Sequence, residues 1–133
     1  HSFPTRRSSD LVLGQAITGW DGEIHGISVD TPQQQLKENV FHLASAAGKM
    51  TGTKINPSKI YTDDSFVGAG YGKKTEGCIA AVNLFARREG IFLDYVYTGK
   101  GAAGLLNYCQ TGKISPNENI VFIHTGGNIE IFE

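Results

Sequence analysis

The chain has 133 residues, of which 40% are hydrophobic, and its formal net charge is −1 at pH 7. This length suits one small domain or part of a larger one, and the composition excludes a disordered or collagen-like chain. The balanced charge gives no electrostatic reason to expect a nucleic-acid or membrane partner. Cys78 and Cys109 lack the spacing of a metal site, so we expect two reduced, partly buried thiols in a cytoplasmic protein.

The first half of the chain predicts a β-α-β order. "HSFPTRRSSD" has no apolar period, so residues 1–10 are expected to be a non-native or disordered leader and residues 11–133 the folded part. "EIHGISV", residues 23–29, indicates a strand. In the next helix, Thr31 is the expected N-cap, with Gln34 as its capping-box partner and Gly48 as the end. A short strand is expected at 59–62.

The second half predicts two further helices and an apolar strand. "DDSFVGAGYGKKT" is too rich in glycine for an element interior and indicates an ordered loop. Thr75 is the expected cap of a helix over 76–89 that Gly90 ends, and another helix is expected from about 100 to 110. "NIVFIHT", residues 119–125, is a continuous apolar run typical of a strand within a parallel sheet. The alternation of elements predicts an α/β fold, with a parallel sheet and flanking helices.

"VYTGKGAAG", residues 96–104, matches the G-x-G-x-x-G spacing of a dinucleotide-binding turn. That fold also needs an acidic residue at the end of the next strand, and the chain has His124 and Thr125 there instead. "VYTGK" and "FIHTGG" are alike in another way, because each is expected to end an apolar strand with a hydroxyl residue followed by glycine. The carboxyl ends of parallel strands are where ligands bind, which predicts a site at these two places.

The stretch from "DDSFVGAGYGKKTEG" to "VYTGKGAAGLL", followed by "ENIVFIHTGG", closely resembles the D-cysteine desulfhydrase and 1-aminocyclopropane-1-carboxylate deaminase family. The resemblance covers residues 12 to 127. It implies a pyridoxal 5′-phosphate enzyme with the fold of the tryptophan synthase β subunit, present here only in its C-terminal part. It further implies a small amino-acid substrate and a homodimeric full-length protein.

The resemblance also implies roles for individual residues. Tyr71 and Tyr97 match the two active-site tyrosines of the family, whose phenols offer an apolar face and one hydroxyl. Thr98 stands where the deaminases have a glutamate near the pyridine nitrogen, and Thr125 stands where they have a leucine. Gly126 and Gly127 are expected to let the chain pass close to the cofactor. The catalytic residues expected are thus Tyr71 and Tyr97, and the cofactor-binding residues are Thr98, Thr125, Gly126 and Gly127, with no metal site.

The two threonines favour one activity within the family. A threonine hydroxyl can hydrogen-bond an unprotonated ring nitrogen without adding charge, which makes the cofactor a weaker electron sink than a carboxylate would. A weaker sink suffices when a good leaving group sits on the β-carbon, so the pattern predicts D-cysteine desulfhydrase activity, giving pyruvate, hydrogen sulfide and ammonia. Sulfo-lyases acting on cysteate share the pattern. Aminocyclopropane carboxylate deamination and a non-catalytic α/β module for a small anion are the alternatives.

Lys100 is not expected to be the Schiff-base lysine, because in the family that lysine lies far upstream. The resemblance places this lysine and the glycine-rich phosphate loop before the present segment. The chain alone is therefore expected to be inactive, because it would lack both the covalent attachment and the backbone donors to the phosphate.

Overall fold

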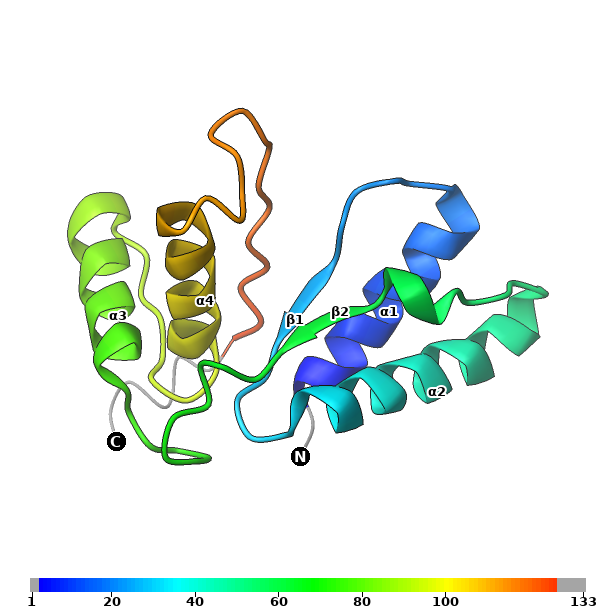
Figure 1. The fold of residues 1–133 in the computed structure, drawn as a ribbon, viewed down its shortest axis with the longest axis horizontal. Coiled ribbons are helices and arrows are strands. Elements are labelled where there is room, and N and C mark those ends of the chain that lie inside the picture. Colours follow the sequence, from blue (N-terminus) through cyan, green and yellow to red (C-terminus); the bar gives the residue numbers. More distant parts are fainter. Residues whose placement is uncertain (1–2, 127–133) are drawn as a thin grey trace. The chain divides into compact units, whose positions relative to one another are not determined.

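The computed structural model describes residues 3–126, which divide into two compact units at Asp64 and Ser65. The elements of the first unit are α1 (Phe3–Thr18), β1 (His25–Ile27), α2 (Gln33–Thr51), the 3-10 helix η1 (Pro57–Lys59) and β2 (Tyr61–Asp63). Those of the second unit are α3 (Glu76–Glu89) and α4 (Thr98–Gln110). Figure 1 shows these elements coloured along the chain.

The first unit is a β-α-β arrangement with an additional helix. β1 and β2 pair in parallel, with His25 opposite Tyr61 and Ile27 opposite Asp63, and α2 connects them. Helices α1 and α2 lie side by side, and they contact β1 and β2 respectively (Figure 1). The parallel pairing and the crossover helix confirm the predicted element order, although both strands are shorter than or offset from the expected ranges.

The core of the first unit forms where apolar side chains of α1 and α2 meet beside the sheet. It consists of Val12, Leu36, Val40, Ala44 and Ile60. Residues 3–10, expected as a non-native or disordered leader, are helical and form the first half of α1. Ser9 anchors this half of the helix, because it is almost fully buried and its hydroxyl donates to the Thr5 carbonyl at 2.6 Å, with the Val40 carbonyl of α2 3.4 Å away. A non-native origin for residues 1–10 stays a prediction.

The ends of α2 differ from the expected caps. Pro32 is at the N-cap and has no side-chain hydrogen bond, and the Gln33 N–H donates to the Asp64 carboxylate at 2.8 Å. The Thr31 hydroxyl instead donates to Asp30, so the predicted capping box does not form. The helix continues past Gly48 and ends at Gly52. An acceptor from a residue 31 positions away replaces the local cap, which no short sequence motif can reveal.

The second unit packs α3 against α4. Its core contains Ala81, Leu93, Ala102 and Ala103, with the partly buried side chains of Phe66, Val82, Phe85, Leu106 and Phe122 packed around them. Two predicted caps of α3 are confirmed. The Thr75 hydroxyl accepts from the Cys78 N–H at 3.1 Å, and Gly90 ends the helix in a left-handed conformation with φ +67°.

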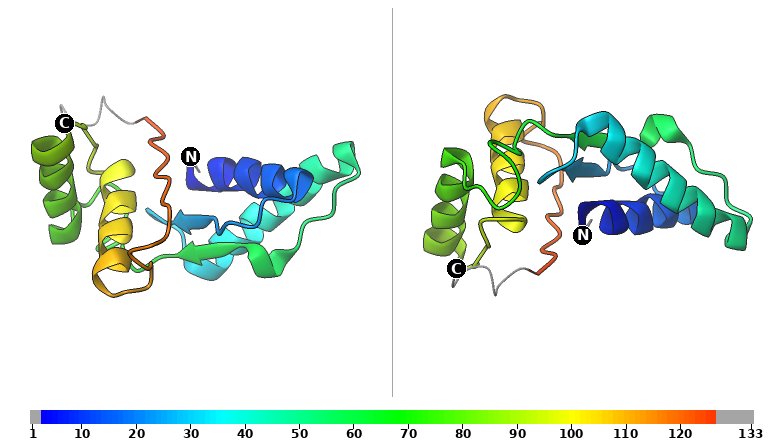
Figure 2. Two further views of the ribbon diagram at one scale, coloured as in Figure 1. Left: turned by 90° about the horizontal axis from the view of Figure 1, so that it is seen from above. Right: turned by 90° about the horizontal axis from the view of Figure 1, so that it is seen from below.

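The two strands predicted in the second unit are absent from its described residues. Residues 95–97 form a turn, and residues 119–125 are extended without a strand partner. Figures 1 and 2 show that segment 119–126 runs beside α4 toward the start of that helix. A strand needs a neighbouring strand to pair its backbone groups, and the described part of this unit provides none. Only Phe122 of the apolar run packs into the core, whereas Val121 is 84% exposed.

No helix among the described residues is both long and apolar enough to cross a membrane. Both cysteines are free thiols, as predicted, but their burial differs. Cys78 is fully buried against α4, whereas Cys109 is exposed.

Candidate active site at the start of helix α4

Two of the predicted site residues, Tyr71 of the glycine-rich loop and Tyr97, are in contact. The hydroxyls of Tyr71 and Tyr97 are hydrogen-bonded to each other, and their rings are 6.0 Å apart between centroids at an interplanar angle of 66°. This edge-to-face geometry is a favourable one for aromatic pairs. Tyr71 comes from the loop and is 50% exposed, while Tyr97 directly precedes α4. The structure therefore brings the two expected catalytic tyrosines together.

Asp94 organises the backbone around Tyr97 and Thr98. Its carboxylate accepts hydrogen bonds from the N–H groups of Val96, Tyr97 and Thr98, at 2.7, 2.5 and 2.9 Å. The carboxylate thereby satisfies amides at the start of α4, where the helix has no partner for them and where negative charge is favoured. Asp94 is fully buried, and this set of bonds folds residues 95–97 into a turn instead of the strand end predicted from sequence.

Thr98 is tied to the same carboxylate. Its hydroxyl donates to Asp94 Oδ2 at 2.5 Å and accepts from the Asp94 N–H at 3.0 Å, and the residue is 3% exposed. A hydroxyl has one proton to donate and two lone pairs. Because the proton is held by Asp94, the Thr98 oxygen in this arrangement can accept one more hydrogen bond but cannot donate one.

Gly99 lets α4 begin close to α3. A Cβ at this position would lie 2.5 Å from the Asp94 carbonyl oxygen and 2.7 Å from Cys78 Sγ, so any larger residue would force the two helices apart. The Cys78 thiol in turn donates to the Tyr95 carbonyl at 3.3 Å. Burial raises the pKa of the Cys78 thiol above its ordinary value, opposed in part by the positive charge of Lys100. The thiol is therefore a neutral packing group at neutral pH.

Lys100 connects α4 to the loop that carries Tyr71. The side chain is fully buried, and its ammonium group donates to the carbonyls of Val67 and Gly70 at 2.8 and 2.9 Å. That Lys100 is not the residue that attaches a cofactor stays a prediction.

The remaining predicted residues lie at the end of the extended segment. Thr125 and Gly126 are half-buried, and the segment reaches toward the start of α4 (Figures 1 and 2). His124 Nε2 lies 2.9 Å from the Phe92 carbonyl oxygen, at hydrogen-bond distance. Gly127 lies outside the described residues. A cofactor contact of Thr125, Gly126 and Gly127 stays a prediction.

Sequence reasoning missed Asp94 and considered Lys100 only as a cofactor lysine. An aspartate side chain can accept from the N–H groups two and three residues on, as Asp94 does, but "IFLDYVYT" was interpreted only as an apolar, irregular segment. No sequence pattern pointed to the bonds of Lys100, because they span 30 and 33 residues. Among residues 3–126 no group of His, Cys, Asp and Glu side chains could hold a metal ion.

Comparisons with known proteins identify what this arrangement is similar to. A family model described as pyridoxal-phosphate dependent enzyme matches residues 21–126. The chain is 36% identical over 110 residues to a D-cysteine desulfhydrase of Yersinia enterocolitica, covering 83% of this chain and 33% of the relative. It is 29% identical over 119 residues to a probable 1-aminocyclopropane-1-carboxylate deaminase of Schizosaccharomyces pombe, covering 88% of this chain and 35% of the relative.

A solved structure shares the fold. The crystal structure of an ACC deaminase homologue matches with a TM-score of 0.73 and 28% identity, covering 86% of this chain and 34% of that one. This match confirms the predicted α/β fold class, a parallel sheet with flanking helices. The chain spans about a third of the length of the relatives it matches.

Proposed function

Since this chain belongs to the pyridoxal-phosphate dependent enzymes, we propose that it is the C-terminal part of a carbon–sulfur lyase most similar to D-cysteine desulfhydrase. The D-cysteine desulfhydrase of Yersinia enterocolitica is 36% identical to this chain, whereas the probable deaminase of Schizosaccharomyces pombe is 29% identical. The substrate class is a small D-amino acid with a leaving group on its β-carbon. We further propose a cytoplasmic, homodimeric full-length protein.

The observation that carries the proposal is the hydrogen-bonded pair of Tyr71 and Tyr97 beside the buried hydroxyl of Thr98. When bound, pyridoxal 5′-phosphate supplies an electron sink for the carbanion formed at the substrate α-carbon. One phenol of the pair donates to the other, and the accepting phenol keeps its own proton. The pair can therefore hold and deliver a proton at the substrate, while the ring faces orient its carbon skeleton.

We propose that Thr98 faces the cofactor's ring nitrogen, but its hydroxyl has the opposite polarity to the one expected. In this arrangement Thr98 does not support the weaker electron sink, and the preference for D-cysteine desulfhydrase rests on the higher sequence identity. The expectation was a hydroxyl bonded to an unprotonated nitrogen, which requires the hydroxyl to donate. In this structure the proton is held by Asp94, so Thr98 suits a nitrogen that carries its own proton. Donation to an unprotonated nitrogen requires that the hydroxyl first leave the carboxylate.

Assays of the complete protein that contains this chain test the proposal. We expect sulfide release from D-cysteine to exceed formation of 2-oxobutanoate from 1-aminocyclopropane-1-carboxylate. Dominant ring opening would contradict the assignment. Tyr71→Phe and Tyr97→Phe should each lower kcat by about 10²–10⁴-fold, the range of a positioned proton-transfer group. Tyr61→Phe is the matched control, because Tyr61 is on β2 in the other unit, where it stacks on His25.

The proposal includes inactivity of the 133-residue chain by itself. The groups gathered at the start of α4 can contact a substrate and a ring nitrogen, but the buried ammonium of Lys100 is occupied by two carbonyls. Covalent attachment of the cofactor and binding of its phosphate are assigned to other parts of the complete protein.

A further inference from the structure

A wholly buried lysine holds the loop that carries Tyr71. Lys100 has no exposed surface, and burying an ammonium costs free energy unless hydrogen bonds replace its water. The Val67 and Gly70 carbonyls provide this replacement at 2.8 and 2.9 Å. These acceptors are backbone atoms, so the position of Lys100 fixes the course of the loop itself.

Besides Lys100, the loop near Tyr71 is held by the Lys73 N–H bond to the Gly70 carbonyl at 3.2 Å and by Lys74 Nζ, which lies 4.2 Å from the Tyr95 ring centroid. Gly68, Gly70 and Gly72 all have positive φ, a conformation that glycine adopts readily but that leaves the unfolded loop with high conformational entropy. Tyr71 is half exposed, and Phe66 is the loop side chain that packs into the core cluster. The bonds of Lys100 therefore lie between this hydrophobic contact and Tyr71.

Both halves of the tyrosine pair depend on the same turn of α4. Tyr97 is the N-cap residue of the helix, and Lys100 lies three residues later, about one helical turn along. Asp94 fixes the backbone N–H of Tyr97 directly, whereas Tyr71 reaches the pair from a segment 26 residues earlier. Lys100 therefore connects the first turn of α4 to the backbone just before Tyr71.

We propose that Lys100 is a positioning residue, whose bonds to the Val67 and Gly70 carbonyls set Tyr71 against Tyr97. Its importance for catalysis rests on the proposed function, whereas its effect on the tyrosine pair does not. The first experiment therefore uses the 133-residue chain and measures structure, and the second uses the complete protein and measures activity.

The first experiment detects the tyrosine pair by NMR in ring-labelled protein. In Lys100→Met we expect loss of the nuclear Overhauser contact between the Tyr71 and Tyr97 rings. Exchange of the Lys73 amide proton, which is bonded to the Gly70 carbonyl, should become about tenfold faster, the effect of losing one net hydrogen bond. The contact between Cys78 and Gly99 should persist, because it reports α3–α4 packing. Lys100→Arg should restore part of the ring contact, because a guanidinium also donates to carbonyls.

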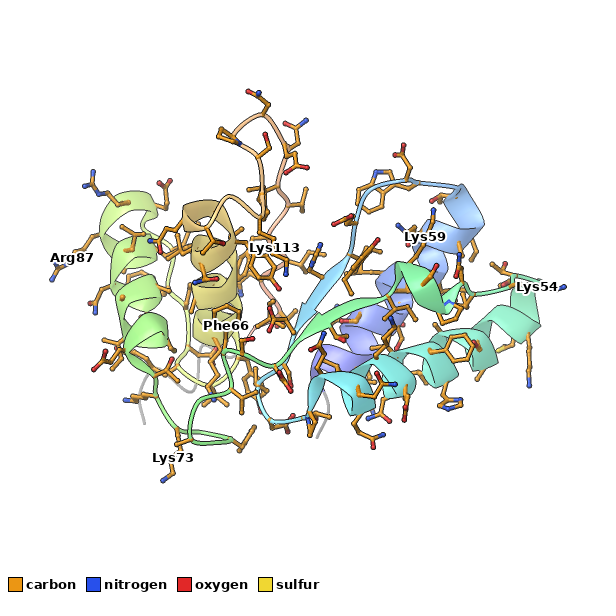
Figure 3. All side chains as sticks on the ribbon, in the orientation of Figure 1. Lys54, Lys59, Phe66, Lys73, Arg87 and Lys113 are labelled. Carbon is orange, nitrogen blue, oxygen red and sulfur yellow. The ribbon has the colours of Figure 1, made fainter. Side chains whose placement is uncertain are left out.

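Lys73→Met is the matched control. Lys73 is in the same loop, is exposed, and its side chain extends away from the ribbon in Figure 3. The same substitution there should leave the ring contact at its wild-type intensity. An unchanged ring contact in Lys100→Met would overturn the proposal. If Lys100→Met does not fold, Lys100→Gln replaces it, and loss of α3–α4 packing in every variant would also overturn a specific positioning role.

The second experiment asks whether Lys100 acts through Tyr71. In the complete protein, Lys100→Met should lower kcat about as much as Tyr71→Phe does. In a Tyr71→Phe background it should have little further effect, because coupled residues are not additive. Full additivity of the two substitutions would show that Lys100 does not act through Tyr71. Absence of lyase activity in the wild-type protein would refute the proposed function and leave the NMR result to decide the positioning.

Discussion

Asp94 shows how one buried side chain can determine the local structure of a site. Its carboxylate accepts hydrogen bonds from three successive N–H groups and from the Thr98 hydroxyl. Such bonds disperse the negative charge and make burial of the carboxylate tolerable without a salt bridge. The same bonds orient the backbone so that Tyr97 reaches Tyr71, and they hold the proton of Thr98.

Asp94→Asn should destabilise the second unit by about 2–3 kcal/mol. The substitution keeps the shape but places an NH₂ group where the carboxylate had accepted hydrogen bonds, so buried donors would face each other. Urea denaturation followed by circular dichroism measures the change. Glu89→Gln is the control, because Glu89 is exposed at the end of α3 and should show no comparable loss. Equal stability of Asp94→Asn and wild type would contradict the capping role.

The two thiols should differ in their reactivity. A disulfide reagent at neutral pH should modify one thiol per chain quickly, at the exposed Cys109, and modify Cys78 only when denaturant is added. Burial and the raised pKa both lower the thiolate fraction of Cys78 in the folded chain. Rapid modification of both thiols under native conditions would contradict the packing against α4.

The raised pKa of Cys78 also predicts a loss of stability at alkaline pH. The folded state favours the neutral thiol. The contribution of this preference to the free energy of unfolding is therefore fully present below the thiol's ordinary pKa of 9.0. It is lost as pH rises toward and through the raised folded-state pKa, because the unfolded thiol ionises first. Cys78→Ala should remove this alkaline decline in the free energy of unfolding. Cys109→Ala should leave it unchanged, and persistence of the decline in Cys78→Ala would assign it to another group.

At the scale of elements, α3 owes its start to Thr75. Its hydroxyl accepts a hydrogen bond from the Cys78 N–H, and its methyl group lies close to Gly68 in the loop that carries Tyr71. Thr75→Ala should cost about 1 kcal/mol of stability, the usual effect of losing an N-cap acceptor. Thr75→Ser should retain most of it, because serine keeps the hydroxyl. Thermal unfolding of the three proteins tests this, and a serine variant as unstable as the alanine variant would point to the methyl contact instead.

The elements also show which features sequence patterns can reveal. The bounds of α3, its cap and its terminal glycine were predictable because they depend on residues within one turn of the helix. The start of α2 was not predictable, because the carboxylate that accepts from its first N–H belongs to Asp64, 31 residues further along the chain. The bonds of Lys100 were not predictable either, because they also join residues far apart in the sequence. The strand predicted at 119–125 has the right composition, but a strand also needs a partner, which composition cannot supply.

At the scale of the molecule, the site residues gather on one unit of a chain that is about a third as long as its relatives. Tyr71, Tyr97 and Thr98 were predicted from a family resemblance, and the structure places them together at the start of α4. The apolar residues Ile120, Val121 and Ile123 are exposed beside that helix, and under the proposed function other parts of the complete protein would cover them.

Under the proposed function, the lysine that attaches pyridoxal 5′-phosphate lies in another part of the complete protein. This predicts how the chain alone responds to the cofactor. Lys100 is buried and its ammonium donates to two carbonyls, so it cannot act as a nucleophile toward the cofactor's aldehyde. After incubation with the cofactor and reduction with borohydride, peptide mass spectrometry should find only low, scattered labelling of exposed lysines such as Lys73. Labelling concentrated on Lys100 would show that the ammonium leaves its carbonyls, and it would contradict both the positioning role and the proposed inactivity of this chain.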